Sequence, residues 1–529
     1  MTRSSILSLS VTFIMLGWLL NCGPDKPDRM PESDSEYNET RSLEEVQTDL
    51  QSEVWSKRST AILAAIDANY REVIPELYRL LREDEHPAVR QTAALALADF
   101  GEKGAAPEIA AMLRKKNGEN PTFLLDALSK LNVASTAPVI VDYLGDENHA
   151  VRLQAVRALE QMKAIAMGPR ILSRLQTISS NDPDMQRAHI MALGKIGYGP
   201  AGAYLLNLAR HLEPGPNLAA TYLALGRVDY HPATAELIAA LDREFVKGRE
   251  NALEATLQIA DSRAPALSFP LIKSDRRETR FAAAEIIGTI ADPSLNPKLE
   301  ALLDGAIPHS VAPAALALGQ RKYQPARPVI EKALGNLEYP DRETTARSLG
   351  WMGSKESVPV LLEVLKEDEG EGRYGAAWSL GILEAKEAIP DLMRAARSSD
   401  ERLAMISVEA LGMMKDPSTL SFLANVAEQD SAARFMAIDS IGQIPGDEAL
   451  QRLKELASSS DEKQKQAAIR ALRYRKEPEV VDILIEILRG TDTSTTSASM
   501  IYSLLHQKTE QEFYSKNQWL YWYDEVRKQ

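Results

Sequence analysis

The chain has 529 residues, a formal net charge of −14, and 6% aromatic residues. An acidic chain repels nucleic-acid phosphates, so we expect no nucleic-acid partner. The single cysteine, Cys22, excludes an internal disulfide framework and a cysteine-based zinc cluster. No segment alternates with the period of two that is typical of strands, which favours an all-α protein.

The N-terminal segment has the pattern of a targeting sequence. Arg3 is followed by an apolar stretch at residues 6–20, which is too short to cross a bilayer comfortably, and then by Cys22. This pattern resembles a bacterial lipoprotein lipobox, although Asn21 stands where the strict motif has Gly, Ala or Ser. The resemblance implies a signal peptide at residues 1–21 and lipidation of Cys22. The alternative is an ordinary secretory peptide or an uncleaved anchor.

Residues 22–50 are predicted to be the acylated cysteine and a disordered tether. The stretch to about Arg41 is rich in Pro, Asp, Glu and Ser and has too few apolar side chains to offset the entropy of ordering. With Cys22 acylated, we expect a protein of the bacterial cell envelope, anchored in a lipid bilayer and facing the periplasm or the cell exterior.

A repeat of about 31 residues runs through the rest of the chain. Its most regular feature is a small-aliphatic-Gly triplet, and we call the position of the Gly the marker. The markers are Ala98, Ser129, Glu160, Gly194, Gly226, Leu257, Gly288, Gly319, Gly350, Gly381, Gly412, Gly442 and Arg473. This spacing predicts about fourteen units within residues 51–493.

Each unit is expected to contain two helices. An aliphatic residue precedes the marker and a small residue lies five before it, which places both on one helical face. Gly101, Gly197 and Gly353 lie three beyond the marker, where a left-handed residue would end the first helix. Proline at marker plus nine predicts the start of the second helix. The positions are Pro297, Pro328, Pro359 and Pro390. Such units must stack on one another to bury their apolar faces, which predicts an α-α superhelix.

An arginine recurs eight residues before the marker, at Arg58, Arg90, Arg152, Arg280, Arg342, Arg373 and Arg434. This arginine is followed by Ala and then by Ala-Leu-Gly, and the combined pattern resembles the short HEAT repeat first described in phycobilin lyases. The resemblance implies a HEAT/armadillo-like solenoid in which each Arg joins an acidic residue of the preceding loop. Asp84, Asp146 and Asp341 are placed for this role, and we interpret the ladder as structural.

Residues 494–529 depart from the repeat and are predicted to be C-terminal Trp-rich capping helices. Trp519 and Trp522 lie in a final helix, and a terminal unit needs a different outer face. The alternative is an aromatic patch that binds a partner.

The sequence contains no pattern that predicts catalysis. No His precedes a Glu as in the iron-binding HEAT hydroxylases, and a nucleophile elbow and a phosphate-binding loop are absent. Residues 370–375 match a dinucleotide fingerprint by letter, but no βαβ unit surrounds them. We therefore expect no enzyme, metal, cofactor or small-molecule substrate. A lyase- or hydroxylase-like enzyme or accessory subunit is the main alternative, and a purely structural envelope component is another.

Two surfaces are candidates for binding another protein. Positions seven and three before the marker share one face of the first helix, and there Tyr374 and Trp378 are apolar among mostly polar residues. Neighbouring candidates are Arg347, Met405 and Phe435. The alternative is that Trp378 packs over an adjacent helix. The second surface is a concave face formed by second helices, where marker plus thirteen carries Glu363, Arg394, Asn425, Glu455 and Glu486. The most coherent hypothesis is a lipid-tethered scaffold for protein–protein interaction.

Overall fold

The computed structural model describes residues 41–179, 181–492, 496–511, 513 and 515–527. Every regular element in those ranges is helical, which confirms the all-α class. Helices α3 to α30 form fourteen successive pairs, as the repeat predicted. The weakest repeat in the sequence, around Leu257, also folds as such a pair, α15 and α16.

The first helices of the pairs carry odd numbers. They are α3 (Trp55–Asp67), α5 (Pro87–Asp99), α7 (Pro121–Leu131), α9 (His149–Gln161), α11 (Pro183–Lys195), α13 (Pro216–Arg227), α15 (Val246–Ile259), α17 (Arg277–Thr289), α19 (Pro308–Gln320), α21 (Arg342–Met352), α23 (Gly372–Ile382), α25 (Glu401–Met413), α27 (Arg434–Gln443) and α29 (Glu462–Ala471).

The second helices carry even numbers. They are α4 (Ile74–Glu83), α6 (Ala106–Lys115), α8 (Ala137–Asp142), α10 (Gly168–Leu175), α12 (Gly202–His211), α14 (Thr234–Ala240), α16 (Ala264–Ser268), α18 (Asn296–Leu302), α20 (Arg327–Leu334), α22 (Val358–Glu367), α24 (Ile389–Ala395), α26 (Leu420–Glu428), α28 (Asp447–Ala457) and α30 (Glu479–Arg489).

The glycines and prolines at helix ends and starts lie where the sequence predicted. Gly101, Gly197 and Gly353 have positive φ values of 74°, 68° and 74°, as a left-handed cap requires. Proline occupies the first or second position of α18, α20, α22 and α24, where the backbone lacks a helical acceptor and a missing N–H costs little.

The marker glycines allow neighbouring first helices to pack closely. A Cβ atom at Gly381 would lie 2.7 Å from the Cα of Ala410 in the next first helix, and one at Gly319 would lie 2.6 Å from the carbonyl oxygen of Ser348. First helices therefore stack on first helices along the whole chain, and each second helix packs against the first helices beside it. Buried hydrophobic side chains continue from Val46 to Tyr523 in two clusters, which meet at residues 264–290 around α16 and α17. The core is therefore extended along the chain, as in a solenoid.

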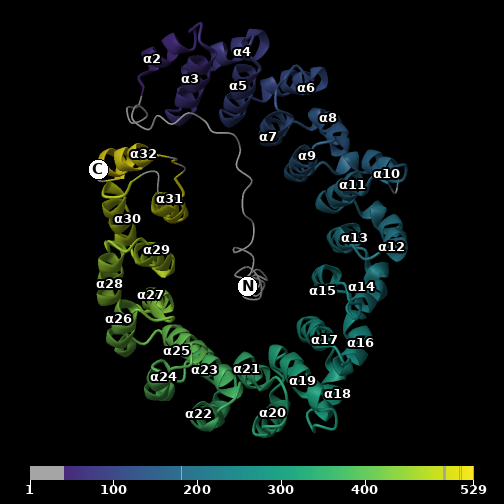
Figure 1. Cartoon of the computed structure of the whole chain (residues 1–529), viewed down its shortest axis with the longest axis vertical. Coiled ribbons are helices and arrows are strands. Elements are labelled where there is room, and N and C mark those ends of the chain that lie inside the picture. The colour runs from purple at the N-terminus through teal and green to yellow at the C-terminus, as the bar shows by residue number, and fades with distance from the viewer. Residues whose placement is uncertain (1–40, 180, 493–495, 512, 514, 528–529) are drawn as a thin grey trace.

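The solenoid curves until its two ends meet (Figure 1). The side-chain amide of Gln518 in α32 (Lys516–Tyr521) donates a hydrogen bond to the backbone carbonyl of Asp67 in α3. First helices line the inside of this ring and second helices form its outer rim. The expectation that second helices form the concave face is therefore wrong. Glu363, Arg394, Asn425, Glu455 and Glu486 lie on outer helices.

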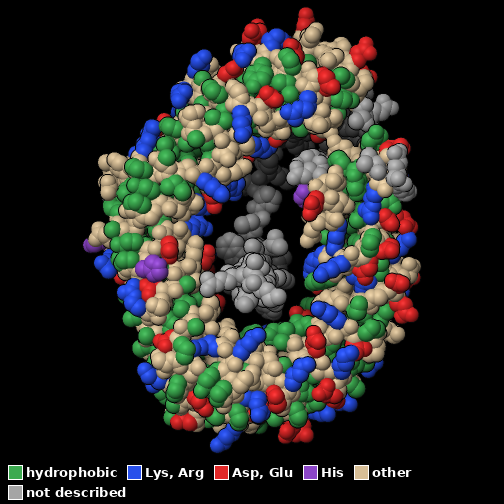
Figure 2. Space-filling view, turned by 180° about the vertical axis from the view of Figure 1, so that it is seen from behind, with side chains coloured by type: hydrophobic (Ala, Val, Ile, Leu, Met, Phe, Trp, Pro, Cys, Tyr) green, Lys and Arg blue, Asp and Glu red, His purple; other side chains and the backbone are tan. Residues whose placement is uncertain are grey.

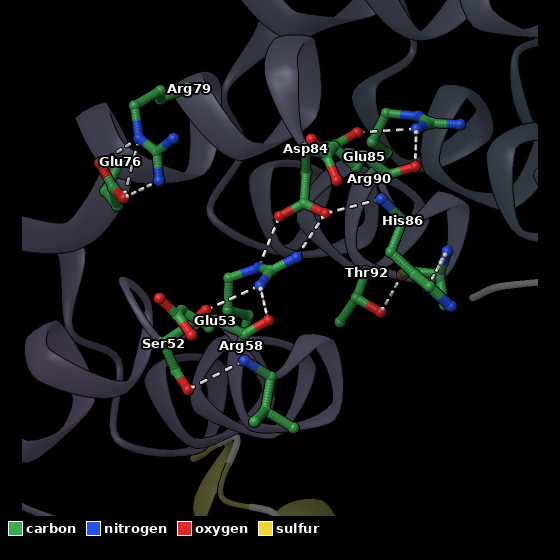
Figure 3. Close-up of polar contacts among 12 residues, drawn as sticks. Ser52, Glu53, Arg58, Glu76, Arg79, Asp84, Glu85, His86, Arg90 and Thr92 are labelled. Atoms are coloured by element: carbon green, nitrogen blue, oxygen red, sulfur yellow. Dashed lines mark hydrogen bonds and ion pairs between the residues drawn. The ribbon is translucent and has the colours of Figure 1, made fainter.

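The predicted arginine ladder is present, but its acidic partners come from the following loop. The guanidinium of Arg58 donates to both carboxylate oxygens of Asp84 at 2.6 and 2.8 Å, and to the carbonyl oxygen of Ser52 at 2.7 Å (Figure 3). The same arrangement pairs Arg90 with Glu119, Arg342 with Asp368, Arg373 with Asp400 and Arg434 with Asp461.

The preceding loop contributes mainly carbonyl oxygens to this ladder. Arg90 and Arg152 donate to the carbonyls of Asp84 and Asp146, each at 2.7 Å. Asp341, the third predicted acid, pairs instead with Arg277, two repeats earlier. Arg58 and Arg90 thus join the loops on both sides of their first helices, which fixes the register between adjacent repeats.

The N-terminal end of the solenoid contains one more helix, α2, before the first pair. Helix α2 (Leu43–Asp49) begins at a capping box formed by Ser42 and Glu45, and buries Val46 and Leu50 completely. Within the described residues, the part of the predicted 22–50 tether at residues 43–49 is therefore helical. Cys22 and the signal peptide lie outside the described residues.

The C-terminal segment packs as a further layer. Helix α31 (Thr496–Thr509) stacks on α29 as the next inner helix. Trp519 of α32 is fully buried and lies edge-to-face against Phe513 and Trp522, with ring centroids 5.0 and 5.7 Å away. This packing is that of a cap. No helix in the described part of the chain is both long and apolar enough to cross a membrane.

Candidate functional site

The inner wall of the ring is built from one face of the first helices. The first helices lie inside the ring. On α21 and α25 the side chains at marker minus seven, minus three and plus one are partly exposed while most others are buried, so this face is the one left open to the ring. These positions are four residues apart and therefore share a helical face. On α21 these positions are Glu343, Arg347 and Trp351, and on α23 they are Tyr374, Trp378 and Ile382.

Apolar side chains gather on this wall over α21, α23, α25 and α27. We call this set the inner apolar patch. It consists of Trp351, Trp378, Ile382, Met405, Met413 and Phe435. Figure 2 shows hydrophobic side chains on the lower inner wall of the opening, where these helices lie. Ile382 is 39% exposed and Phe435 36% exposed, so the patch offers apolar area to solvent.

Trp378 is buried at the base of the patch, with 8% of its surface exposed. It lies edge-to-face against Trp351, with ring centroids 5.4 Å apart, and the guanidinium carbon of Arg347 lies 5.0 Å from its ring centre. The alternative that Trp378 packs over an adjacent helix is therefore confirmed. The exposed apolar side chains come from its neighbours.

Tyr374 is also held within the protein. Its hydroxyl donates a hydrogen bond to the carboxylate of Asp400 at 2.7 Å. Among the interactions that lower the pKa of Asp400, this hydrogen bond has the largest effect. Arg402 covers the ring of Tyr374, with its guanidinium carbon 4.4 Å from the ring centre. Both predicted aromatic residues thus shape the patch, whereas Ile382, Met405, Met413 and Phe435 provide its accessible area.

Glu343 connects two inner helices, α21 and α25, that lie on either side of α23. It pairs with Arg347 at 3.0 Å on its own helix and with Arg402 of α25 at 2.6 Å, across the intervening α23. A similar pair, Arg277 with Asp341 at 2.7 Å, spans α19. Contacts that skip a repeat require strong inward curvature. Arg347 and Arg402 are consequently already paired with a carboxylate of the chain.

Two inner carboxylates differ from these paired groups. Glu285 and Glu409 are half-buried at marker minus three, and neither forms an ion pair or hydrogen bond within the described residues. Burial raises the pKa of both side chains. At Glu409 the positive charge of Arg347 opposes this shift, and the negative charge of Asp439 adds to it.

The predicted candidates therefore share one region but have different roles. Arg347, Tyr374 and Trp378 form its base, and Met405 and Phe435 lie at its surface. Sequence reasoning missed Trp351, Ile382 and Met413, although they lie 31 residues apart at marker plus one. No group of three or more His, Cys, Asp or Glu side chains suited to hold a metal occurs in the described ranges.

The family of HEAT repeats matches residues 46–122, 311–381, 365–434 and 426–504, together more than half of the chain. No curated protein matches this chain. Among solved structures, the CpcE–CpcF complex of phycocyanin lyase from Nostoc sp. PCC7120 is 19% identical with a TM-score of 0.31, and the match covers 46% of this chain and 94% of that one. Kap121p bound to RanGTP is 14% identical with a TM-score of 0.43, and 84% of this chain matches 57% of that one.

Kap95p bound to RanGDP is 13% identical with a TM-score of 0.45, and the match covers 88% of this chain and 77% of that one. The chain spans 57–64% of the length of the Kap121p chains it matches. At these identities the likeness concerns the fold alone.

Proposed function

Because the chain belongs to the HEAT-repeat family, we propose that it is a lipid-anchored scaffold of the bacterial cell envelope, which binds another protein through the inner wall of its ring. The observation that carries this proposal is the inner apolar patch. Water-exposed apolar side chains that lie together on a rigid concave wall are typical of a surface that another protein covers. Activity would then come from shape and binding rather than from catalysis.

The proposed location rests on the sequence before the solenoid. Cys22 follows an apolar segment in a lipobox-like pattern, and α2 begins about twenty residues later. A chain of that length reaches at most about 70 Å when fully extended. The tether would hold the ring close to the membrane, facing the periplasm or the cell exterior.

Affinity capture from cross-linked envelopes tests the binding role. We expect Ile382→Glu to reduce recovery of a stoichiometric partner at least about tenfold, because a buried, unpaired charge opposes docking. Leu337→Glu is the matched control, since Leu337 is 71% exposed and lies in the loop between α20 and α21, outside the patch. Equal recovery with wild type and Ile382→Glu, or no stoichiometric partner at all, would contradict the proposal.

Membrane fractionation tests the anchor separately. We expect Cys22→Ala to move the protein from the membrane fraction to the soluble fraction, since the thiol is the site of acylation. A protein that stays with the membrane after this substitution would show that another feature holds it there.

A further inference from the structure

The clearest change along the inner wall occurs at marker plus one. In the units before α21 this position is polar in every case from Asp99 onward, namely Asp99, Lys130, Gln161, Lys195, Arg227, Gln258, Thr289 and Gln320. In three consecutive units it becomes Trp351, Ile382 and Met413, and it returns to Gln443 in α27. An apolar row of three repeats thus lies between polar positions on both sides. The next position, Tyr474 in the following repeat, is aromatic, and its hydroxyl donates a hydrogen bond to Asp439.

The spacing of this row fits an α-helix better than a strand. Packed helices lie about 8–10 Å apart, so the three side chains repeat at about that distance. Residues seven apart on an α-helix are separated by about 10.5 Å and lie on nearly the same face. Side chains on one face of a strand recur at about 6.7 or 13 Å, which does not match. A helix lying along the row can therefore place one apolar side chain against each repeat.

The charged groups near this apolar row indicate which polar side chains a partner needs. Glu409 is half-buried beside Met405 and Met413 on the same helix, and it has no ion pair within the described residues. Arg347 and Arg402 are both paired with Glu343, so neither neutralises Glu409 through direct contact. A carboxylate in apolar surroundings gains most from an incoming cation, because that cation replaces lost water. The net charge of −14 adds long-range attraction for a basic partner.

We propose, as an inference that rests on the proposed function, that the inner apolar patch binds an amphipathic, basic α-helix of the partner protein. Apolar side chains seven residues apart on that helix contact Trp351, Ile382 and Met413, and a Lys or Arg side chain pairs with Glu409. Phe435 and Met405 extend the contact at one side of the row. This assigns a chemical class of partner to the wall.

Binding of defined peptides to the purified full chain tests this assignment. One fluorescent probe is a helix of about 21 residues with Leu at heptad spacing and Lys elsewhere. The comparison probe replaces every Lys with Glu. We expect the Leu/Lys probe alone to bind, with affinity reduced about tenfold by Ile382→Ser and about fivefold to tenfold by Glu409→Gln. Circular dichroism verifies that both variants stay folded.

The matched control is Glu254→Gln. Glu254 occupies the same marker-minus-three position on α15, where it is exposed and remote from the patch, so we expect unchanged affinity. Three results would overturn the assignment: no binding of the Leu/Lys probe, equal binding of the Leu/Glu probe, or equal effects of Glu409→Gln and Glu254→Gln. If envelope capture still depends on Ile382 in such a case, the scaffold function stands and only the partner class is wrong.

Discussion

Glycine at the marker has no Cβ atom, and this allows neighbouring inner helices to approach each other closely. At Gly381 the nearest atoms belong to the backbone and Cβ of Ala410, which cannot rotate away. Because the next repeat stacks on the same contact, this position determines both local packing and the angle between repeats.

We expect Gly381→Ala to lower the free energy of unfolding by about 1–3 kcal/mol, because the added methyl group overpacks a backbone contact. Urea unfolding followed by circular dichroism measures the change. Gly335→Ala is the control, since a Cβ atom there would meet only the carbonyl oxygen of Lys332 at an ordinary 3.5 Å. Equal effects of the two substitutions would show that the close approach does not limit packing.

The carboxyl group of Glu409 gives a pH-dependent prediction. Burial raises its pKa above the value in the unfolded chain, so the native state binds this proton more tightly. Ionisation of Glu409 therefore costs stability as the pH rises through the folded-state pKa. We expect Glu409→Gln to be at least as stable as wild type at about pH 7, with the difference shrinking towards about pH 4. Urea midpoints across this range test it, and a less stable variant at neutral pH would mean that the carboxylate has a stabilising partner.

The sequence predicted that positions seven and three before the marker share one helical face, but it did not predict that marker plus one belongs to the same apolar patch or how far each side chain is exposed. Position relative to the marker places Trp378 on the inner face. Its burial depends on Trp351 and Arg347 from the preceding helix, which approach only because the solenoid curves. Exposure is a property of several repeats together, so no single repeat reveals it.

At the scale of elements, α2 shows where composition misleads. The stretch before it is rich in Pro, Asp, Glu and Ser, and this composition predicts a tether that reaches residue 50. Val46 and Leu50 are four residues apart and form a short apolar stripe that α3 covers. In isolation such a helix is unstable, so only its packing against the solenoid makes it form.

We expect Leu50→Ala to destabilise the N-terminal repeat locally by about 2–5 kcal/mol, because a fully buried side chain is lost. Repeat proteins can unfold from one end, so the effect should concentrate in α2 and α3 rather than spread evenly. Amide hydrogen exchange by mass spectrometry resolves these helices. Leu63→Ala is the control, since Leu63 is 50% exposed. Unchanged exchange in Leu50→Ala would mean that α2 does not pack on the core.

The position of the second helices on the outer rim is another feature that could not be predicted from the sequence repeat. The periodicity shows that two helices alternate and which faces are buried. It does not fix which row of helices lies closer to the axis of curvature, because that depends on side-chain volumes at every interface. The marker glycines shorten the distances between first helices, which is consistent with first helices forming the inner row.

At the scale of the whole molecule, small rotations between fourteen repeats accumulate until α32 meets α3. The sequence predicted an α-α superhelix but not its closed outline, because an error in the rotation between two repeats is multiplied along the chain. Closure places the inner wall around an opening, so a bound segment is surrounded by protein.

Spin labels on either side of the seam test closure. With Cys22 replaced by Ser, labels at Leu63→Cys in α3 and Asn517→Cys in α32 should give a short, narrow distance distribution in pulsed electron resonance. Both sites are exposed, so labelling should leave the core intact. A long and broad distribution would show that the ends stay apart in solution.

The claim that the ring holds a protein partner against its inner wall is tested most directly by site-specific photo-cross-linking in native envelopes. A photoreactive phenylalanine at Ile382 or Phe435 lies on the patch, whereas one at Leu337 or Tyr521 lies at a strongly exposed position outside it. We expect the same discrete partner adduct from both patch positions and none from the two others. Adducts from Leu337 or Tyr521 alone, or equal labelling at all four positions, would contradict the account.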